Sequence, residues 1–599
     1  RGPDDEGTFT SRDRKIGLVN RRLAIIDLTS KGHQPMTFKN RFVITYNGEI
    51  YNFQEERRKL EKIGCQFKSN SDTEVLLALY EKYGKNCLTR LRGMFAFAIY
   101  DDKDKTLFLA RDRIGKKPLK YYIDGSVFIF ASELKAILTQ PEIKKEIDYV
   151  AVQAYLVYGY APAPLTGFIG IKKLPPGHYM MIDLRSKNFY LKRYWEPDFS
   201  QKLVLSEREW CNKILETLEE STELRMISDV PIGAFVSGGV DSSAVTYAMS
   251  KFSPKPINTF TIVFENKNWS EAKYAGNIAK KFKTNHHELL AKPESVEILP
   301  ELAYHYEEPF ADAGNVVAYM VSRLAKKYVT VILNGDGGDE LFAGYPNRYF
   351  RLKRDVDFNK WINTLRPAAA MSLKALGKIS KSTVIKRSNV FLEKSRLPLY
   401  QRFASYNQIF SYEEILLISK GSLEKLSLKQ NPYSIVEECF RQFSGRDLKD
   451  AGLKFDLLYW LPDDLLAKVD IASMAASLEA RSPLLDHKMI ELSDQIPFNL
   501  KVKKGESKYI LKKALEKVVP KENLYRPKMG FGVPLHIWFS VKLRGYATSV
   551  LLSKKAKIKE IKKEYEIETM LKSHSETSDF GPKLWALLSL ELWMKEYFN

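Results

Sequence analysis

Cysteine is scarce in this chain of 599 residues, and its spacing excludes the usual cysteine chemistries. The four cysteines, Cys65, Cys87, Cys211 and Cys439, lie far apart and form no Cys-x-x-Cys pair. Neither a disulfide framework nor a cysteine-ligated zinc site is therefore expected. A reducing compartment is the default for such a chain, so we predict a cytoplasmic location.

Long apolar runs and long basic tails are also missing. No apolar run reaches the length of a membrane span, so none is expected. The 94 Lys and Arg residues outnumber the 73 Asp and Glu residues, which gives a formal net charge of +21. A basic surface can attract nucleic acid or an anionic membrane face. The basic residues are scattered in short clusters, however, and no RNA-binding aromatic signature accompanies them. We therefore predict solvated charge and no nucleic-acid partner.

The first part of the chain has the pattern of a strand-rich α+β domain. β-Branched and aromatic runs bounded by turn residues predict strands, and apolar residues at helical spacing predict helices. A Pro- and Gly-rich stretch, 159–176, predicts a long surface connection. The predicted strands are Arg22–Asp27, Phe42–Asn47, Phe95–Asp101, Leu107–Arg111 and Val127–Ala131, and the predicted helices are Asn52–Ile63 and Thr73–Tyr83.

The pattern changes near Glu196–Ser206, where we place a domain boundary, giving domains 1–195 and 196–599. Beyond it, apolar strands alternate with helices, which is typical of a parallel sheet with helices on its faces. After about Arg351 the chain becomes helical and Lys-rich. In parallel sheets, ligands bind beyond the carboxyl ends of the strands. The predicted strands of this sheet are Ile232–Val236, Thr259–Phe264, His286–Leu289 and Val329–Leu333.

A glycine-rich heptapeptide, Ser-Gly-Gly-Val-Asp-Ser-Ser, lies between a buried strand and a helix at 237–243. Its glycines allow close approach of the backbone to an anion, and successive amides with the helix amino terminus can bind phosphate. Asp241 would repel a bare phosphate but fits a Mg²⁺ ion that bridges phosphates. The alternative is an ordinary capped turn. No Gly-Lys-Ser/Thr follows, so the loop is not of the Walker type.

A second loop, Asn-Gly-Asp-Gly-Gly-Asp-Glu at 334–340, also follows a predicted strand. Its three acids are costly to crowd together, and a bound cation would relieve their repulsion. The alternative is an acidic surface turn. Two such loops at the ends of strands in one sheet favour a joint site for magnesium and phosphate.

These loops resemble those of the glutamine-hydrolysing asparagine synthetase family. The first resembles the PP-loop of ATP pyrophosphatases. Further resemblance is carried by 334–345 (NGDGGDELFAGY), 466–470, 477–486 (SLEARSPLLD) and 525–534 (YRPKMGFGVP). The family implies an α/β parallel-sheet PP-loop domain with a helical carboxy-terminal part. It also implies that a carboxylate is adenylated by ATP and then amidated by ammonia.

The resemblance assigns roles in the ligase site residue by residue. Asp241 and Asp339 would bind Mg²⁺, Asp336 would act on the amide-forming step, and Lys528 would stabilise charge on the intermediate. Asp336 stands where many relatives have Glu, and Asn334 where Ser is common. For Lys528 the alternative is a solvated charge. The implied ATP-binding residues are Ser237, Gly238, Gly239, Asp241, Ser242, Val263, Asn334 and Gly335.

The front half resembles a class II glutamine amidotransferase domain, which implies an Ntn-type αββα sandwich. The motifs that carry this are 1–4, 20–28, 32–36, 46–53 (YNGEIYNF), 71–74 and 91–95. The implied glutamine-binding residues are Arg22, Asn47, Glu49 and Asp72, and Asn47 with Gly48 would form the oxyanion hole. For Asn47-Gly48 alone, a hairpin turn is the alternative.

The family's nucleophile is an amino-terminal Cys, and no cysteine of this chain occupies a matching motif. We therefore predict that the sequence is truncated before Arg1. As it stands, this chain should not hydrolyse glutamine.

The resemblance leaves the acceptor open between aspartate and a carboxylate on a cell-envelope sugar or peptide. A non-catalytic protein that kept the fold is a third hypothesis, but Asp241 and Asp339 remain acidic, which weighs against it. The expected cofactors are ATP and Mg²⁺. The expected partners are small molecules, with a homodimer as an open alternative to the monomer.

Overall fold

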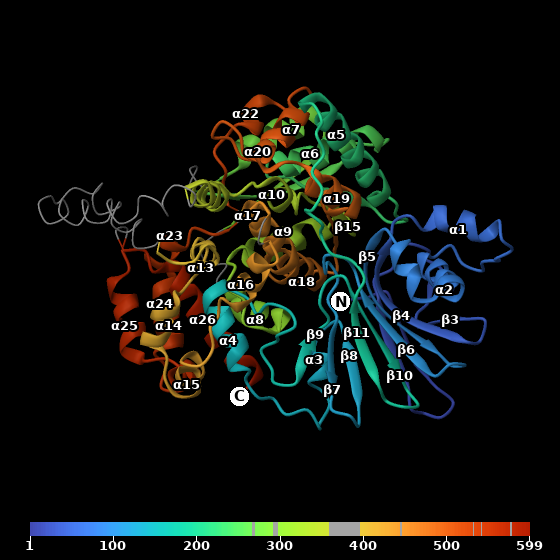
Figure 1. Ribbon diagram of the computed structural model, residues 1–599, viewed down its shortest axis with the longest axis horizontal. Coiled ribbons are helices and arrows are strands. Elements are labelled where there is room, and N and C mark those ends of the chain that lie inside the picture. Colours follow the sequence, from blue (N-terminus) through green and yellow to red (C-terminus); the bar gives the residue numbers. More distant parts are fainter. Residues whose placement is uncertain are drawn as a thin grey trace, which may run out of the picture.

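We call residues 1–195 the front half and residues 196–599 the back half, a division that stays a prediction. The front half contains an antiparallel sheet and the back half a parallel sheet (Figure 1). The computed structural model describes residues 1–265, 270–291, 297–358, 396–443, 446–530, 532–540, 542–575 and 578–598. The predicted fold class, strand-rich first and parallel afterwards, is confirmed. The boundary itself lies in a segment without helix or strand, between Arg193 and Glu207.

A six-stranded antiparallel sheet forms the centre of the front half. Its order is β11-β10-β6-β5-β4-β3. Helices α1 (Phe53–Glu61) and α2 (Asp72–Tyr83) lie beside it in Figure 1, with α2 packed on β4. The strands are β11 (Phe189–Arg193), β10 (His178–Asp183), β6 (Thr106–Arg111), β5 (Gly93–Asp101), β4 (Phe42–Ile50) and β3 (Met36–Phe38).

A second layer of strands covers the other face of this sheet. It consists of a three-stranded sheet, β8 (Phe128–Ala131), β7 (Lys120–Ile123) and β9 (Ile171–Lys173), and the ribbon β1 (Asp5–Thr10) and β2 (Gly17–Arg22). Apolar side chains of both layers share one buried cluster, among them Ala98, Leu109 and Tyr121. Helices α3 (Leu134–Ile137) and α4 (Tyr149–Tyr158) complete the half.

The predicted strand Arg22–Asp27 is wrong, because β2 ends at Arg22. Ile25 and Ile26 are buried, as their apolar character suggests, but their backbone runs as a loop. Asp27 has a positive φ of 57°. The loop's backbone partner is Asp229 of the back half, which donates from N to Ile25 O at 3.0 Å and accepts from Asp27 N at 2.8 Å. A contact between the halves replaces the strand pairing.

The predicted surface connection at 159–176 is also wrong. Thr166, Phe168 and Leu174 are fully or almost fully buried, and β9 lies within the stretch. Its backbone is held by the back half, since Ala163 N donates to Asp463 Oδ2 at 2.7 Å. Much of the stretch is therefore a buried contact, although Pro164 and Ile169 are exposed.

The parallel sheet of the back half has the order β14-β13-β12-β15-β16. Every neighbouring pair in it is parallel, which confirms the prediction. Because β12 and β15 are neighbours, the loops that follow them start side by side. The strands are β14 (Asn285–Ala291), β13 (Asn258–Phe264), β12 (Ile232–Phe235), β15 (Val331–Leu333) and β16 (Glu479–Arg481).

Helices connect and flank these strands. The helix before β12, α5 (Glu207–Arg225), starts with a capping box in which Ser206 and Glu209 satisfy each other's backbone amides. The others around the sheet are α6 (Val240–Phe252), α7 (Ala272–Phe282), α8 (Leu299–Tyr306), α9 (Gly314–Lys326), α10 (Gly338–Phe342), α18 (Ala467–Ala475), α19 (His487–Gln495), α20 (Phe498–Lys501), α21 (Tyr509–Leu515) and α22 (Lys521–Leu524).

The remaining described helices gather at the left of Figure 1, where the carboxy-terminal α26 (Gly581–Tyr597) packs on α23 and α24. None of the helices in the described part of the chain combines the length and apolar character needed to cross a bilayer. The remaining helices are α26, α13 (Leu399–Ala404), α14 (Tyr412–Ile418), α15 (Gly421–Ser427), α16 (Ser434–Arg441), α17 (Leu448–Phe455), α23 (Leu535–Ser540), α24 (Lys542–Leu551) and α25 (Glu564–Ser573).

Candidate active site

A cavity of about 610 Å³ opens beyond the carboxyl ends of β12, β13 and β15. Both glycine-rich loops line it, together with residues 505–508 and the 523–530 segment. The cavity therefore lies where ligands of parallel sheets bind.

The first loop is shaped by its glycines and fixed by neighbouring side chains. Gly238 has a φ of +71°, and a Cβ on it would lie 2.3 Å from the backbone of Tyr274, so only glycine fits. Asn523 Nδ2 donates to Gly238 O at 2.9 Å. The hydroxyls of Ser237 and Ser242 lie 3.1 Å apart. Amides, hydroxyls and the start of α6 thus converge as a phosphate loop requires.

The second loop packs directly against the first. A Cβ on Gly335 would lie 2.7 Å from Ser242 N, and a Cβ on Gly338 would lie 2.1 Å from Asp241 Oδ1. The absence of these two side chains lets the loops touch. It brings Asp339, at the start of α10, to the same place as Asp241.

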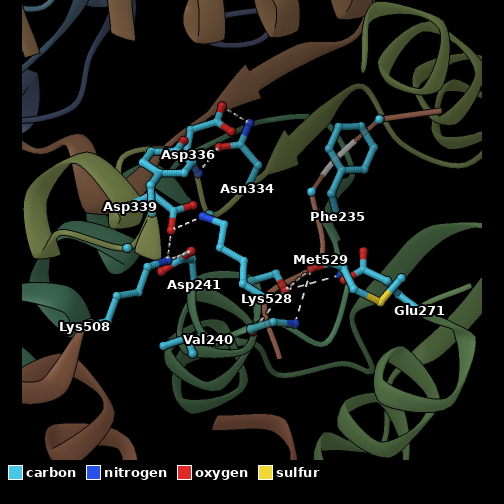
Figure 2. Close-up of a pocket in the computed structure, with 18 of the residues that line it drawn as sticks. Phe235, Val240, Asp241, Glu271, Asn334, Asp336, Asp339, Lys508, Lys528 and Met529 are labelled. Carbon is cyan, nitrogen blue, oxygen red and sulfur yellow. Dashed lines mark hydrogen bonds and ion pairs between the residues drawn. The ribbon is translucent and has the colours of Figure 1, made fainter. Parts of the chain in front are cut away.

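Asp241 and Asp339 meet at one lysine (Figure 2). Lys508 Nζ contacts Asp241 Oδ2 and lies 2.7 Å from Asp339 Oδ1. Lys528 Nζ reaches the same oxygen of Asp339 from another direction and lies 3.8 Å from the ring centroid of Tyr345. Two carboxylates and two amines therefore share one small volume at the cavity wall.

Burial and the lysines act in opposite directions on these acids. Burial raises the pKa of Asp241, and its contact with Lys508 offsets this only in part. For Asp339, burial is outweighed by Lys508 and Lys528, which lower its pKa to about 2. The pKa of Lys508 is raised despite burial, because two carboxylates surround it. Asp339 and Lys508 therefore stabilise each other's charged forms although both are buried.

The pair of carboxylates fits a magnesium ion whose remaining ligands are phosphate and water oxygens. In the described residues, no group of three or more His, Cys, Asp or Glu side chains is placed to hold a metal. Asp241 Oδ1 is buried without a hydrogen-bond partner. Mg²⁺ is commonly bound by one or two carboxylates, with phosphate and water oxygens completing its octahedron. A metal held by protein alone would fit poorly here.

Asp336 lies beside these residues and is held by Asn334. Asn334 Nδ2 donates to Asp336 Oδ2 at 2.7 Å, and Asp336 N donates to Asn334 Oδ1 at 3.4 Å. The side chain of Asp336 is 25% exposed. Its carboxylate therefore lines the cavity in a fixed orientation while it stays accessible to a small reactant.

Strand β13 contributes mostly apolar side chains to the cavity. Phe260, Ile262 and Phe264 line it, together with Thr261. Val263, assigned to ATP binding, is not among the lining residues, and neither is Gly238. The other assigned ATP-binding residues all line the cavity. Their binding roles stay predictions.

In the front half, Asn47 and Gly48 lie inside β4, not in a hairpin turn. Asn47 Nδ2 donates to Ser132 Oγ at 3.3 Å. Gly48 has a φ of +151°, and a Cβ there would lie 2.1 Å from Met94 O of the paired strand β5. The glycine is therefore required by the close strand contact, and its role as an oxyanion-hole amide stays a prediction.

Asp72, Glu49 and Arg22 lie around this strand. Asp72 Oδ2 accepts from Ile50 N of β4 at 2.9 Å and from Tyr46 OH at 2.9 Å. Glu49 Oε2 is buried without a hydrogen-bond partner. Burial raises the pKa of both acids. The charges of Asp72 and Glu479 raise the pKa of Glu49 further, and Glu479 also acts to raise the pKa of Asp72. A ligand ammonium between them would relieve this repulsion, which suits the amino group of an amino acid.

Two contacts differ from a simple glutamine pocket. Arg22 Nη2 donates to Ile26 O and Asp27 O, both at 2.8 Å, so part of its guanidinium holds the adjoining loop. Glu49 Oε1 lies 3.6 Å from Arg481 Nη2 of the back half. Arg481 is fully buried and links the two halves.

Several residues of the site carry no distinctive sequence signal. Lys508 stands in a Lys-rich stretch with nothing to separate it from solvated lysines. Arg526, which contacts Glu271 and donates to Ser237 O at 3.4 Å, lies within a motif that drew attention only to Lys528. Asp312 and Lys468, paired at 2.6 Å on the cavity wall, come from distant segments.

Comparisons with known proteins cover both halves. The family model for the glutamine amidotransferase domain matches residues 1–195, and that for asparagine synthase matches residues 213–595. Among solved structures, glutamine phosphoribosylpyrophosphate amidotransferase from Bacillus subtilis is 19% identical over 40% of this chain and 51% of its own. Its TM-score of 0.22 is too low to support an argument.

Curated relatives match over nearly the whole chain. Asparagine synthetase (glutamine-hydrolyzing) 1 from Bacillus subtilis strain 168 is 33% identical, over 99% of this chain and 91% of that protein. A putative asparagine synthetase (glutamine-hydrolyzing) 2 from Methanocaldococcus jannaschii is 36% identical, over 79% and 93%. Amidase chry2 from Gibberella zeae is 26% identical, over 90% and 84%. With these matches and a family model that covers more than half of its length, the chain belongs to the asparagine synthase family.

Proposed function

We propose that this protein makes asparagine by activating the side-chain carboxylate of aspartate with ATP and amidating it with ammonia from glutamine. The observation that carries the proposal is the meeting of Asp241, Asp339 and two lysines above a phosphate loop. Relatives named as asparagine synthetases match nearly end to end, which supports this choice of reaction.

The chemistry requires two steps in one water-poor cavity. A carboxylate is a poor electrophile, so its oxygen first attacks the α-phosphorus of ATP and expels pyrophosphate. Ammonia then attacks the acyl carbon and expels AMP. Lys528, which lies beside Asp339 at the cavity wall, would offset negative charge on the reacting phosphate, a kind of contribution commonly worth a few kcal/mol. Mg²⁺, when bound between Asp241 and Asp339, would neutralise charge on the phosphate chain.

Asp336 is the proposed proton acceptor of the second step. The attacking nitrogen must lose a proton as the amide forms, and a carboxylate within hydrogen-bond reach can take it. Asp336 lines the same cavity as Lys528 and keeps an accessible side chain. Its short side chain makes the placement of this carboxylate critical.

The cavity wall also carries groups that suit an amino-acid acceptor. Asp312 and Lys468 line the cavity, and their side chains pair at 2.6 Å. Glu340 lines it as well, and burial with the charge of Asp339 raises its pKa to about 7. An acid and a base close together can bind the ammonium and the carboxylate of a free amino acid. This favours aspartate over a carboxylate on a sugar.

The proposed setting is the cytoplasm, because all four cysteines are free thiols. The proposed partners are glutamine, aspartate and ATP. The assay supplies ammonium, so that its outcome depends on the ligase site alone.

The test incubates the purified chain with ammonium chloride, MgATP and aspartate. We expect AMP, pyrophosphate and asparagine in equal amounts, and no AMP without aspartate. AMP release with a sugar or peptide carboxylate, but none with aspartate, would show that the acceptor is that carboxylate and not aspartate. Release of ADP and phosphate in place of AMP and pyrophosphate would overturn the proposed chemistry.

A further inference from the structure

A line of buried polar side chains runs from the front half to Asp336. Lys116 lies in the front half, in the loop between β6 and β7, and its side chain is 4% exposed. Its Nζ donates to Ser482 Oγ at 3.0 Å. Ser482 Oγ donates to Asn334 Oδ1 at 2.7 Å, and Asn334 Nδ2 donates to Asp336 Oδ2 at 2.7 Å.

The chemistry of the groups fixes the direction of this line. The protonated ammonium of a lysine only donates, and an ionised carboxylate only accepts. Ser482 accepts from Lys116, so its single hydrogen points onward to Asn334. The amide of Asn334 is then oriented with its oxygen toward Ser482 and its nitrogen toward Asp336. Removing any member leaves the next free to turn.

Rigid anchors hold both ends of the line. The loop of Lys116 is fixed by Asp112, which is buried and accepts from Lys116 N and Lys117 N, both at 2.9 Å. Ser482 directly follows β16 and Asn334 directly follows β15, and these strands pair in parallel. The spacing between the members is thus set by two backbones and does not depend on long flexible side chains alone.

From this geometry we propose that Lys116, Ser482 and Asn334 form a directional hydrogen-bond chain through which the front half positions the carboxylate of Asp336. They are positioning residues for amide formation. The inference rests on the proposed function, in which Asp336 receives the proton from the attacking nitrogen. Lys116 Nζ also lies 3.7 Å from Asp336 Oδ2, so the front half contributes a cation at the edge of the ligase site.

The test separates the two steps of the reaction in Ser482→Ala and Lys116→Met. With ammonium as nitrogen donor, aspartate-dependent pyrophosphate release reports activation, and the KM for ammonium with the ratio of asparagine to AMP reports amidation. Loss of one hydrogen bond should raise the KM for ammonium about fivefold or more and lower that ratio. The initial rate of pyrophosphate release should fall by a smaller factor than the rate of asparagine formation, because only the second step uses the Asp336 carboxylate.

Two further variants exclude a merely structural effect. Ser482→Thr keeps the hydroxyl, and a cavity of about 20 Å³ beside Ser482 leaves room for a methyl group, so it should restore the ratio. Lys120→Met removes another buried lysine that crosses between the halves, at 3.0 Å from Glu307, without touching the cavity. It should lower the melting temperature yet keep the wild-type ratio. A ratio unchanged in Ser482→Ala, or changed equally in Lys120→Met, overturns the proposal.

Crystals of the wild type and Ser482→Ala provide a readout that needs no acceptor. The proposal expects the Asn334 amide and the Asp336 carboxylate to shift or to occupy several positions in the variant. An unchanged Asp336 overturns it. If the wild type makes no asparagine while Ser482→Ala still shows this shift, the proposed function is refuted and the hydrogen-bond chain is supported.

Discussion

The contact between the two glycine-rich loops predicts the effect of adding one methyl group. In Gly338→Ala, the new Cβ would lie 2.1 Å from Asp241 Oδ1 and 2.4 Å from Asp241 Cγ. The φ of Gly338 is not positive, so the backbone accepts alanine and the effect is steric. An ordinary contact begins at 3.4 Å, so Oδ1 must retreat by about 1.3 Å (3.4 minus 2.1).

A shift of that size removes Asp241 from the position where it meets Asp339. Displacements of about 1 Å in a reacting site can cost about 100-fold in rate. We therefore expect aspartate-dependent pyrophosphate release to fall about 100-fold or more in Gly338→Ala. Overpacking of this kind costs about 1–3 kcal/mol in stability, so the protein should still fold.

A matched control isolates the effect of position. Gly276 lies within α7, and a Cβ there would meet nothing within 4 Å. Gly276→Ala should keep full activity and gain up to about 1 kcal/mol of stability, because alanine favours helix. Pyrophosphate release by Gly338→Ala within threefold of the wild-type rate would refute the packing of the loops as described.

Three more predictions follow from the same structure. Lys528→Met should lower kcat for AMP formation about 100-fold or more, measured by AMP release, because it removes the amine beside Asp339. Chelation of divalent cations with EDTA should abolish pyrophosphate release, and added MgCl₂ should restore it; activity that survives dialysis against EDTA would contradict the magnesium assignment. Asp486 should make stability acid-sensitive. Burial alone would raise its pKa, but Arg225 and Arg92, at 2.7 and 2.8 Å, hold the pKa well below the ordinary value. A lowered folded-state pKa stabilises the protein above the unfolded pKa of about 4, and this stability is lost as pH falls below it. The wild-type melting temperature should therefore drop between pH 5 and pH 3, whereas Asp486→Asn, destabilised by about 3–5 kcal/mol at pH 7, should show a smaller drop. Equal drops in the two proteins would contradict this.

Much of the ligase fold was predictable because its signals are local. Each glycine-rich loop directly follows a short apolar strand, and the parallel arrangement of those strands places both loops at one edge of the sheet. The two loops could be paired on that basis alone, whereas the choice of Asp339 among the three acids of the second loop came from the family resemblance. The chemistry of the loop residues, amides and carboxylates, then indicated phosphate and magnesium.

The predictions of local structure were wrong where contacts between the two halves decide the backbone conformation. The apolar run after Arg22 has strand-like residues, but Asp229 of the back half takes its backbone hydrogen bonds. The Pro-rich stretch at 159–176 is buried because the back half covers it, with Asp463 as a partner. Local patterns carry no information about a partner several hundred residues away.

Apart from Lys528, which the family resemblance indicated, the lysines of the site could not be chosen from the sequence for a related reason. Lys508 follows a glycine-containing turn and adopts a positive φ of 53°, which places its amine between two acids. Lys116 resembles its neighbour Lys117, yet Lys117 pairs with Asp470 at 3.2 Å and Lys116 reaches toward the ligase cavity. Only the assembled fold separates these roles.

Crystals with a bound metal ion and nucleotide would show whether Asp241 and Asp339 form the magnesium and phosphate site. Crystals grown with Mn²⁺ and an ATP analogue that resists cleavage between the α- and β-phosphates would show the metal by its anomalous scattering. We predict one peak within about 2.2 Å of an oxygen of both Asp241 and Asp339, bridging to the phosphates. A nucleotide bound elsewhere, or a metal that contacts neither carboxylate, would contradict it.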